Sequence, residues 1–476
     1  MTASNSALPH LSAEEIEGGA SVAAALVAET AALADSSYRK LESKAMTATV
    51  WTIGSYGIAQ SMRMVNNMVL TRLLVPEYFG LMALVSTLVT GMRLLTDIGL
   101  APAVIGSPRG DEPVFLDTAF SVQLVRGILL WIAALVLTLP LTHLYNDHRL
   151  AGLLPVLSFA IVIDALQSTN LITAARHIGV RRLVTIDFCG QVFTILVTIV
   201  WAYETRSVWA LVAGTLASSV FKTTVSHIPL VLPGRRNGFA WEKEAVHSLV
   251  HFGKWILLGT AFYFLAAQAD RLILGKLVSF TTLGIYTIAF TIADIPRQVI
   301  LQFTDRVGLP FAAKMSHLPR PEFRANCLKY RLYVLIAGGV ILSIVVNGGG
   351  FFVTHAYNAR YHDAKWMVPI LALGLWHTLL YATNKEILVA LGKTQYNAIG
   401  TGIFATAMFI AMPVAFHFFG MMGALISVAA GDLPLYVVLG IGVAREKVNM
   451  WKQDALATGI FLVLLAIGFG IKQLLG

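Results

Sequence analysis

Apolar runs of about 20 residues recur along this chain from residue 46 to the C-terminus. A helix of that length can cross about 30 Å of hydrocarbon. In lipid the backbone N–H and C=O groups find no water to bond, so such runs must be helical, whereas the strands of a membrane barrel are about half as long. The sequence therefore predicts an all-α integral membrane protein with about 12–13 membrane-spanning helices.

These runs divide the chain into five parts. A polar tail (1–45) comes first, followed by six spans (46–232), a polar linker (233–250), six more spans (251–443) and an extra C-terminal segment (444–476) that either crosses the membrane or lies along it. The tail lacks the basic start and cleavage site of a signal peptide, so we expect it to be cytoplasmic. The expected spans lie near residues 46–70, 79–103, 118–141, 151–172, 186–204, 207–232, 251–275, 283–306, 329–353, 367–390, 397–418 and 419–443, with the last apolar segment at 455–476.

The charged residues are few and unevenly placed. They make up 13% of the chain, whereas about a quarter is usual for a soluble protein. The net charge of +9 does not indicate nucleic-acid binding, because Lys and Arg gather in short connections on one expected side of the membrane. This asymmetry predicts a cytoplasmic N-terminus in a multi-pass protein of a bacterial inner membrane. The opposite connections hold only Arg72, Arg149, Arg206, Lys276, Arg360 and Lys365.

Motifs for bound cofactors are missing from the sequence. Cys189 and Cys327 form no disulfide framework, and the histidines show no metal-ligand spacing. The glycines at 348–350 lie in an apolar run without the pattern of a phosphate loop. We therefore expect no cofactor and no metal. Because the sequence offers no nucleotide site, we expect any work that the protein performs across the membrane to be driven by an ion gradient, the membrane potential or consumption of the substrate outside. The connections are also too short for the catalytic domain of a membrane enzyme.

An internal repeat relates the two halves at an offset of 204 residues. The stretch 70–83 aligns with 274–287 without gaps, so that Gly80 matches Gly284 and Arg93 falls on Arg297. Six spans and their connections fill about that length, so both halves would enter the membrane in the same direction. Two similar bundles around a central cavity suit alternating access. Chance similarity between apolar segments is the competing explanation.

The segment VLTRLLVPEYFGLMALVSTLVTGMRLLTDIGLAPAVI (69–105) resembles the opening signature of the polysaccharide transporter family, which includes Wzx-type oligosaccharide and O-antigen flippases. The family belongs to the multidrug/oligosaccharidyl-lipid/polysaccharide exporter superfamily. The long N-terminal tail departs from the usual pattern. The matching positions are Arg72, Leu73, Leu74, Pro76, Phe79, Gly80, Asp97, Gly99 and Leu100.

This resemblance implies two six-helix lobes around a V-shaped cavity. It also implies a transporter, not an enzyme, that moves oligosaccharide units linked to undecaprenyl pyrophosphate from the cytoplasmic to the outer leaflet. Such units serve the synthesis of exopolysaccharide, capsule or O-antigen. The implied partners are the lipid-linked oligosaccharide, membrane lipid, and polysaccharide polymerase and chain-length proteins.

Arginines inside the spans are the first candidates for substrate binding, because ionisable groups in lipid are costly and usually functional. Arg93 and Asp97 stand four residues apart and are expected to share a helix face, as are Asp294 and Arg297. We predict that Arg93 and Arg297, with Arg126 at similar depth, receive the pyrophosphate through paired hydrogen bonds. The alternative is that the Arg–Asp pairs are internal salt bridges.

A second polar group lies toward the expected outer ends of the first and seventh spans. Arg63, Asn66 and Asn67 belong to the first span, and Asp270 and Arg271 to the seventh. They could pair as an outer gate, with Arg63 also contacting substrate. Side chains that reach toward the membrane surface are the simpler alternative.

Two acidic residues near the middle of spans are candidates for coupling transport to a proton or cation. Asp164 and Asp432 could bind such an ion, although hydrogen bonding between helices would also explain them.

Two other functions remain open from the sequence. A multidrug or small-solute exporter of the same superfamily would need a narrower cavity with fewer arginines. A membrane glycosyltransferase or polymerase would need a large loop with paired carboxylates or metal ligands.

Overall fold

The computed structural model describes Gly54 and residues 57–177 and 180–475. The predicted tail, residues 1–45, lies outside these described residues. Every helix with defined bounds belongs to Ser55–Gly476, the second of the two units into which the chain divides.

The described elements are all helical, as the apolar runs predict. Residues 57–73 form the described part of the first expected span. The helices that follow are α2 (Pro76–Leu94), α3 (Leu100–Gly106), α4 (Pro113–Tyr145), α5 (Leu150–Ala165), α6 (Asn170–Arg176), α7 (Val180–Thr205), α8 (Trp209–Ser226), α9 (Lys243–Leu277), α10 (Phe280–Phe303), the π-helix η1 (Thr304–Gly308), α11 (Leu309–Met315), α12 (Arg320–Ala356), the 3₁₀-helix η2 (Ala359–Tyr361), α13 (Ala364–Ala390), α14 (Gln395–Ala430), α15 (Leu433–Arg445) and α16 (Trp451–Leu475).

The expected span 79–103 is broken in the structure. Helix α2 ends at Leu94, and α3 begins after Gly99, which has a φ of +59°. The side chain of Asp97 accepts a hydrogen bond of 2.9 Å from the Gly99 N–H. Glycine adopts this left-handed conformation without steric cost, and aspartate often bonds to the backbone two residues on. These two residues therefore end the helix inside an apolar run.

Two further spans are bent. Helices α5 and α6 correspond to the expected span 151–172 and meet at an angle of 62°. Helix α14 runs through the expected boundary at 418–419, but Gly420 within it has a φ of +56° and marks a kink. The two parts of α14 are therefore separate helices that meet at Gly420, and the boundary expected at 418–419 lies within two residues of this break.

Six of the described helical segments are long and apolar enough to cross a membrane, and a seventh is added if the pair α5–α6 counts as one span. The remaining long helices still coincide with expected spans. Helices α2, α9 and α10 carry Arg93, Asp270 and Arg297 within those spans, which lowers their hydropathy. The chain is an all-α, multi-pass membrane protein.

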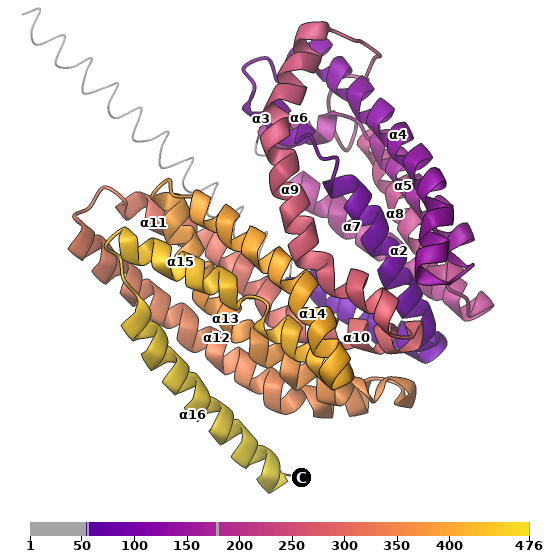
Figure 1. Cartoon of the computed structure of the whole chain (residues 1–476). Helices are drawn as coiled ribbons and strands as arrows, with labels where there is room; N and C mark the ends of the chain where they lie inside the picture. The colour runs from indigo at the N-terminus through magenta and orange to yellow at the C-terminus, as the bar shows by residue number, and fades with distance from the viewer. Residues whose placement is uncertain (1–53, 55–56, 178–179, 476) are drawn as a thin grey trace, which may run out of the picture. The chain divides into compact units, whose positions relative to one another are not determined.

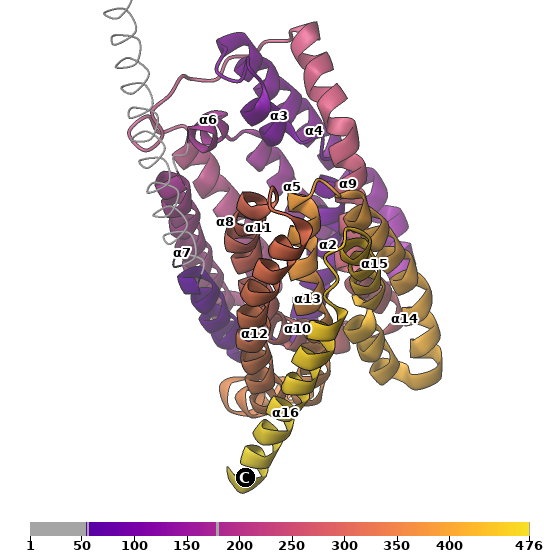
Figure 2. The ribbon, with the colours of Figure 1, turned by 90° about the vertical axis from the view of Figure 1, so that its left-hand side faces the viewer.

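The helices pack in two groups joined in the middle. Helices α2, α4, α5, α7 and α8 form an N-terminal helix group, and α10, α12, α13, α14, α15 and α16 form a C-terminal helix group. Figures 1 and 2 show the first group in indigo to magenta and the second in colours from rose and salmon through orange to yellow. Helix α2 packs along α10, and α9 contacts both α2 and α14. The assignment of these groups to two repeated lobes stays a prediction.

A glycine pair allows α2 and α10 to cross closely. A Cβ atom on Gly80 would lie 1.9 Å from the Phe280 carbonyl oxygen, and one on Gly284 would lie 1.8 Å from the Pro76 carbonyl oxygen. Both contacts are impossible for a side chain, so each position requires glycine. The contacts are reciprocal, and they join residues that the 204-residue offset aligns.

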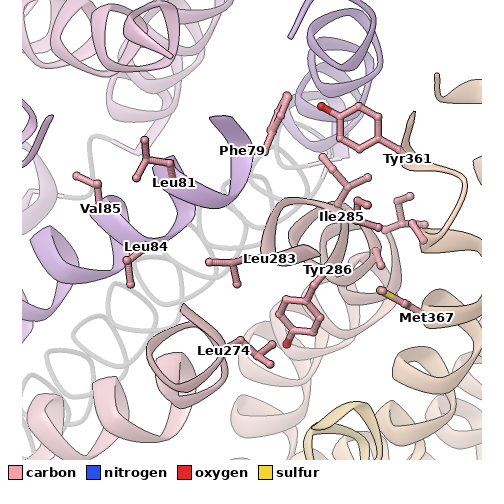
Figure 3. Packing of buried hydrophobic residues seen from close by; sticks show 14 of the residues in the cluster. Phe79, Leu81, Leu84, Val85, Leu274, Leu283, Ile285, Tyr286, Tyr361 and Met367 are labelled. Atoms are coloured by element: carbon pink, nitrogen blue, oxygen red, sulfur yellow. The ribbon is translucent and has the colours of Figure 1, made fainter. Parts of the chain in front are cut away.

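Apolar side chains surround this crossing, as Figure 3 shows. Leu81 and Leu84 of α2 and Leu283 of α10 are fully buried. Tyr361 packs edge-on against Phe79, with ring centres 5.8 Å apart, and donates a hydrogen bond of 3.1 Å to the Leu74 carbonyl oxygen. The cluster therefore joins the two helix groups through both packing and a polar contact.

The C-terminal helix α16 is fixed to the C-terminal helix group by a buried ion pair. Arg331 of α12 is fully buried and pairs with Asp454 of α16. Its Nε also donates to the Thr383 hydroxyl at 2.7 Å. Phe461 stacks on Trp376 of α13 with ring centres 4.3 Å apart. Because α16 is long and apolar enough to cross a membrane, we expect it to span the bilayer beside α12.

Candidate functional site

A polar cavity of about 530 Å³ lies inside the N-terminal helix group, between α2, α5, α7 and α8. Arg93 and Asp164 line it and form an ion pair, with 2.7 Å between the guanidinium NH2 and Oδ2. Lys222 and Asp187 form a second ion pair of 2.7 Å in the same cavity. We call this the Arg93 cavity. It holds charged groups of both signs between helices that are otherwise apolar.

Arg93 and Asp97 were expected to share a helix face, with a salt bridge between them as the alternative, and the structure shows neither arrangement. The two residues do not share a helix face, because α2 ends at Leu94 and the Asp97 carboxylate caps the turn at Gly99. Arg93 instead reaches across to Asp164 on α5. Four-residue spacing predicts a shared face only while the helix continues.

Arg126 of α4 forms hydrogen bonds with the C-terminal end of α2 and the turn that follows it. Its guanidinium donates hydrogen bonds of 2.6 Å to the Arg93 carbonyl oxygen and 3.2 Å to the Thr96 hydroxyl. The structure therefore places Arg126 directly beside Arg93, with its NH2 group bonded to the backbone of α2.

A second polar cavity, of about 370 Å³, lies inside the C-terminal helix group and beside α9. We call it the Arg297 cavity. Arg297 pairs with the buried Asp294, which also accepts a hydrogen bond of 2.7 Å from the Gln298 side chain. Asp432, at the start of α15, accepts a hydrogen bond from the Thr378 hydroxyl. The cavity therefore gathers one arginine and several carboxylates in a buried setting.

The two cavities have corresponding walls. Helices α2, α5, α7 and α8 line the first, while α10, α13, α14 and α15 line the second together with α9. These are the second, fourth, fifth and sixth expected spans of each half. Arg93 and Arg297, which the 204-residue offset aligns, thus line two separate cavities, and the structure does not bring them into one shared site.

A third cavity, of about 500 Å³, lies between the helix over residues 57–73, α7 and α10. Arg63, Asn66 and Asn67 line it together with Gln60, Gln191 and Gln298, so we call it the amide cavity. Arg63 donates hydrogen bonds of 3.0 and 2.7 Å from Nε and NH2 to the Gln60 side-chain oxygen.

Asp270 and Arg271, which were expected to belong to an outer gate, form hydrogen bonds with residues other than Asn66 and Asn67. Asp270 lines the Arg297 cavity and accepts a hydrogen bond from the buried Tyr286 hydroxyl. Arg271 donates a hydrogen bond of 2.7 Å to Gln268, and its guanidinium lies 4.9 Å from the centre of the Phe290 ring. The structure pairs neither residue with Asn66 or Asn67 among the bonds of the described residues.

Sequence reasoning missed several polar residues of these cavities. Asp187 and Lys222 lie within expected spans, so their position in apolar runs was a usable signal. Arg331 also lies within an expected span and was not singled out, although it is fully buried against Asp454. Gln60, Gln191 and Gln298 were not singled out, because an uncharged polar residue within an apolar run does not by itself indicate a particular chemistry. Over the described residues, no group of three or more His, Cys, Asp or Glu side chains could hold a metal ion.

Comparisons with known proteins find a matching family model and related sequences. The model of the family described as "Polysaccharide biosynthesis protein" matches residues 69–329. The lipopolysaccharide biosynthesis protein WzxC of Escherichia coli K12 is 21% identical over 91% of this chain and 89% of its own length. The succinoglycan biosynthesis transport protein ExoT of Rhizobium meliloti is 21% identical over 58% of this chain and 56% of its own length.

Solved structures share the fold at low sequence identity. The lipid II flippase MurJ, in an inward closed conformation, superposes with a TM-score of 0.66 at 14% identity, over 87% of this chain and 91% of its own. An inward-facing multidrug resistance MATE family transporter superposes with a TM-score of 0.64 at 13% identity, over 85% of this chain and 95% of its own. The helical architecture is therefore that of these membrane transporters.

Proposed function

The chain belongs to the polysaccharide biosynthesis protein family, and from this premise we propose that it is a flippase for lipid-linked oligosaccharides. It is a transporter and not an enzyme. Its substrate would be repeat units on undecaprenyl pyrophosphate, moved from the cytoplasmic to the outer leaflet of a bacterial inner membrane. These units would feed the synthesis of exopolysaccharide, capsule or O-antigen.

The physical task is to carry a charged head group past hydrocarbon. An unpaired ion in an apolar medium costs many kcal/mol, so the path must supply cations and hydrogen-bonding groups. The observation that carries the proposal is the pair of corresponding cavities, each with one arginine from an equivalent helix. Arg93 and Arg297 would each offer a fork of N–H donors that fits phosphate oxygens.

Both arginines are held by carboxylates in this structure, which suggests how transport is coupled to an ion. Protonation of Asp164, or a cation bound to it, would release Arg93 for the pyrophosphate. Asp294 would act in the same way on Arg297, with Asp432 nearby in the same cavity. Cation entry and substrate binding would then favour each other.

The proposed architecture has two lobes, 46–232 and 251–443, joined by the cytoplasmic linker 233–250 and followed by the extra segment 444–476. The N-terminus, with the tail 1–45, would be cytoplasmic. The reciprocal contact of Gly80 and Gly284 supports a repeat axis between the lobes. A polymerase and chain-length proteins would receive the substrate outside.

The shared fold leaves one alternative function open, that of a multidrug or small-solute exporter. The two functions predict different consequences of deleting the gene. Deletion should leave polyprenyl-linked oligosaccharide on the cytoplasmic face if the proposal is right. Resistance to added drugs without that accumulation would favour the exporter.

Substitution of the two arginines provides the test of mechanism. Arg93→Gln together with Arg297→Gln should fail to relieve the accumulation, although the protein is made at the normal level. Arg360→Gln, which removes an exposed arginine of a loop after α12, should relieve it fully. Normal transport by the double variant would end the idea that these arginines take the pyrophosphate.

A further inference from the structure

The amide cavity differs in chemistry from the two charged cavities. Five of its lining residues carry carboxamides, contributed by three helices: Gln60, Asn66, Asn67, Gln191 and Gln298. A carboxamide both donates and accepts hydrogen bonds, which is also the property of a hydroxyl group. A wall of carboxamides therefore fits a ligand that is rich in hydroxyl groups.

The charge of the wall also favours a neutral ligand. No carboxylate is among the described residues that line this cavity, whereas Asp164 and Asp187 line the Arg93 cavity. The cation present, Arg63, already donates two hydrogen bonds to Gln60. Thr291 and Tyr357 add further polar atoms without adding charge at neutral pH.

One polar atom of the wall is buried without a protein partner. The side-chain oxygen of Asn66 is buried and accepts no hydrogen bond from another described residue. A buried acceptor left in this way costs about 1–3 kcal/mol. If the Asn66 side chain turned toward the cavity that it lines, a ligand hydroxyl could donate to this oxygen and recover the cost.

The amide cavity also adjoins the Arg297 cavity through one side chain. Gln298 lines the amide cavity, and its Nε2 donates a hydrogen bond of 2.7 Å to Asp294, the partner of Arg297. The volume of about 500 Å³ lies within the range of small-molecule pockets, roughly 300–1,000 Å³. Two parts of one substrate could therefore occupy the two cavities together.

We propose that the amide cavity binds the sugar hydroxyls of the lipid-linked glycan, while the pyrophosphate lies at the arginines. This inference rests on the proposed function and assigns a site to the uncharged part of the substrate. Selection among glycans would then depend on the carboxamides of the amide cavity. Binding of the lipid pyrophosphate would depend on Arg93 and Arg297.

The test compares two ligands on the purified, full-length protein. One is undecaprenyl pyrophosphate without sugar, and the other is the polyprenyl-linked oligosaccharide that accumulates in cells lacking this gene. Asn67→Leu with Gln191→Leu replaces two carboxamides by branched apolar side chains. Gln395→Leu makes a similar change at the exposed start of α14, outside the three cavities.

We expect the double variant to bind the oligosaccharide-linked lipid more weakly by roughly five-fold for each lost carboxamide, or about 25-fold. Its affinity for undecaprenyl pyrophosphate should stay within about two-fold of the unaltered protein, as should both affinities of Gln395→Leu. Equal affinity of the double variant and the unaltered protein for the oligosaccharide-linked lipid would overturn the inference.

Two other results are decisive in different ways. If the unaltered protein binds undecaprenyl pyrophosphate but gains nothing from the sugars, the glycan site is refuted and the proposed function stands. If it binds neither lipid, the proposed function fails and the glycan site fails with it.

Discussion

Replacing Gly284 by alanine tests the close crossing of α2 and α10. The new Cβ atom would lie 1.8 Å from the Pro76 carbonyl oxygen, which is a backbone atom and cannot rotate away. A normal carbon–oxygen contact is roughly 3.3 Å, so the two helices would have to separate by about 1.5 Å. Overpacking of a filled core costs about 1–3 kcal/mol. We expect the upper half of that range, because Leu283 and Tyr286 beside the crossing are fully buried.

The assay is unfolding of the purified protein by increasing SDS in mixed micelles. Gly402→Ala is the matched control, since a Cβ atom there would meet nothing within 4 Å. Alanine is the better helix former by about 1 kcal/mol, so the control should unfold at an equal or higher SDS fraction. The reasoning is refuted if Gly284→Ala proves as stable as Gly402→Ala.

Three more predictions follow from the ion pairs. Arg331→Leu leaves Asp454 buried without its cation and should lower the free energy of unfolding by about 3–5 kcal/mol. The double variant Arg331→Leu with Asp454→Leu should recover most of this loss in the same assay. A double variant no more stable than the single variant would contradict the prediction. Asp164→Asn removes the carboxylate that holds Arg93, so undecaprenyl pyrophosphate should bind the purified protein roughly three-fold more tightly, and weaker binding would speak against release of the arginine. Burial raises the pKa of Asp147 in the loop after α4, but hydrogen bonds and charge from the arginine two residues on outweigh it and hold that pKa below its ordinary value. This carboxylate therefore stabilises the fold at neutral pH and stops doing so as the pH falls below about 4; Asp147→Asn should flatten that part of the curve of Tm against pH, and an unchanged curve would exclude the contribution.

The helices could be predicted from the sequence because the signal is local. An apolar run must satisfy its own backbone in lipid, and a helix is the solution available to a single segment. The all-α membrane fold is therefore confirmed, and each expected span with described residues overlaps one or two helices. The breaks were harder to foresee. The break at Gly99 depends on the Asp97 side chain, which accepts a hydrogen bond from the Gly99 N–H. This bond partly replaces the helical hydrogen bonds that are lost where α2 ends.

The partners of the charged residues could not be predicted, because they come from other helices. Arg93 meets Asp164, 71 positions along the chain, and Arg331 meets Asp454 on a helix that the sequence left without a definite place. The 204-residue offset aligned Gly80 with Gly284, but only the structure shows that these glycines contact each other. Spacing along one helix describes a face, and the choice of a neighbour across the bundle requires the packing.

Placement of the arginines in separate cavities constrains how an anionic substrate could bind. A pyrophosphate that reached Arg93 would share it with Asp164 and lie close to that carboxylate. Two like charges about 4 Å apart repel by about 1 kcal/mol in water, and because Arg93 and Asp164 are both partly exposed the repulsion here stays close to that value and offsets part of the gain from the arginine. Neutralising the carboxylate with a proton or cation removes this repulsion. Because linkage is reciprocal, a substrate bound at Arg93 would in turn raise the affinity of Asp164 for that proton or cation. Under the proposed function, the Arg93–Asp164 ion pair therefore accounts both for retention of the pyrophosphate head group and for coupling of transport to an ion gradient.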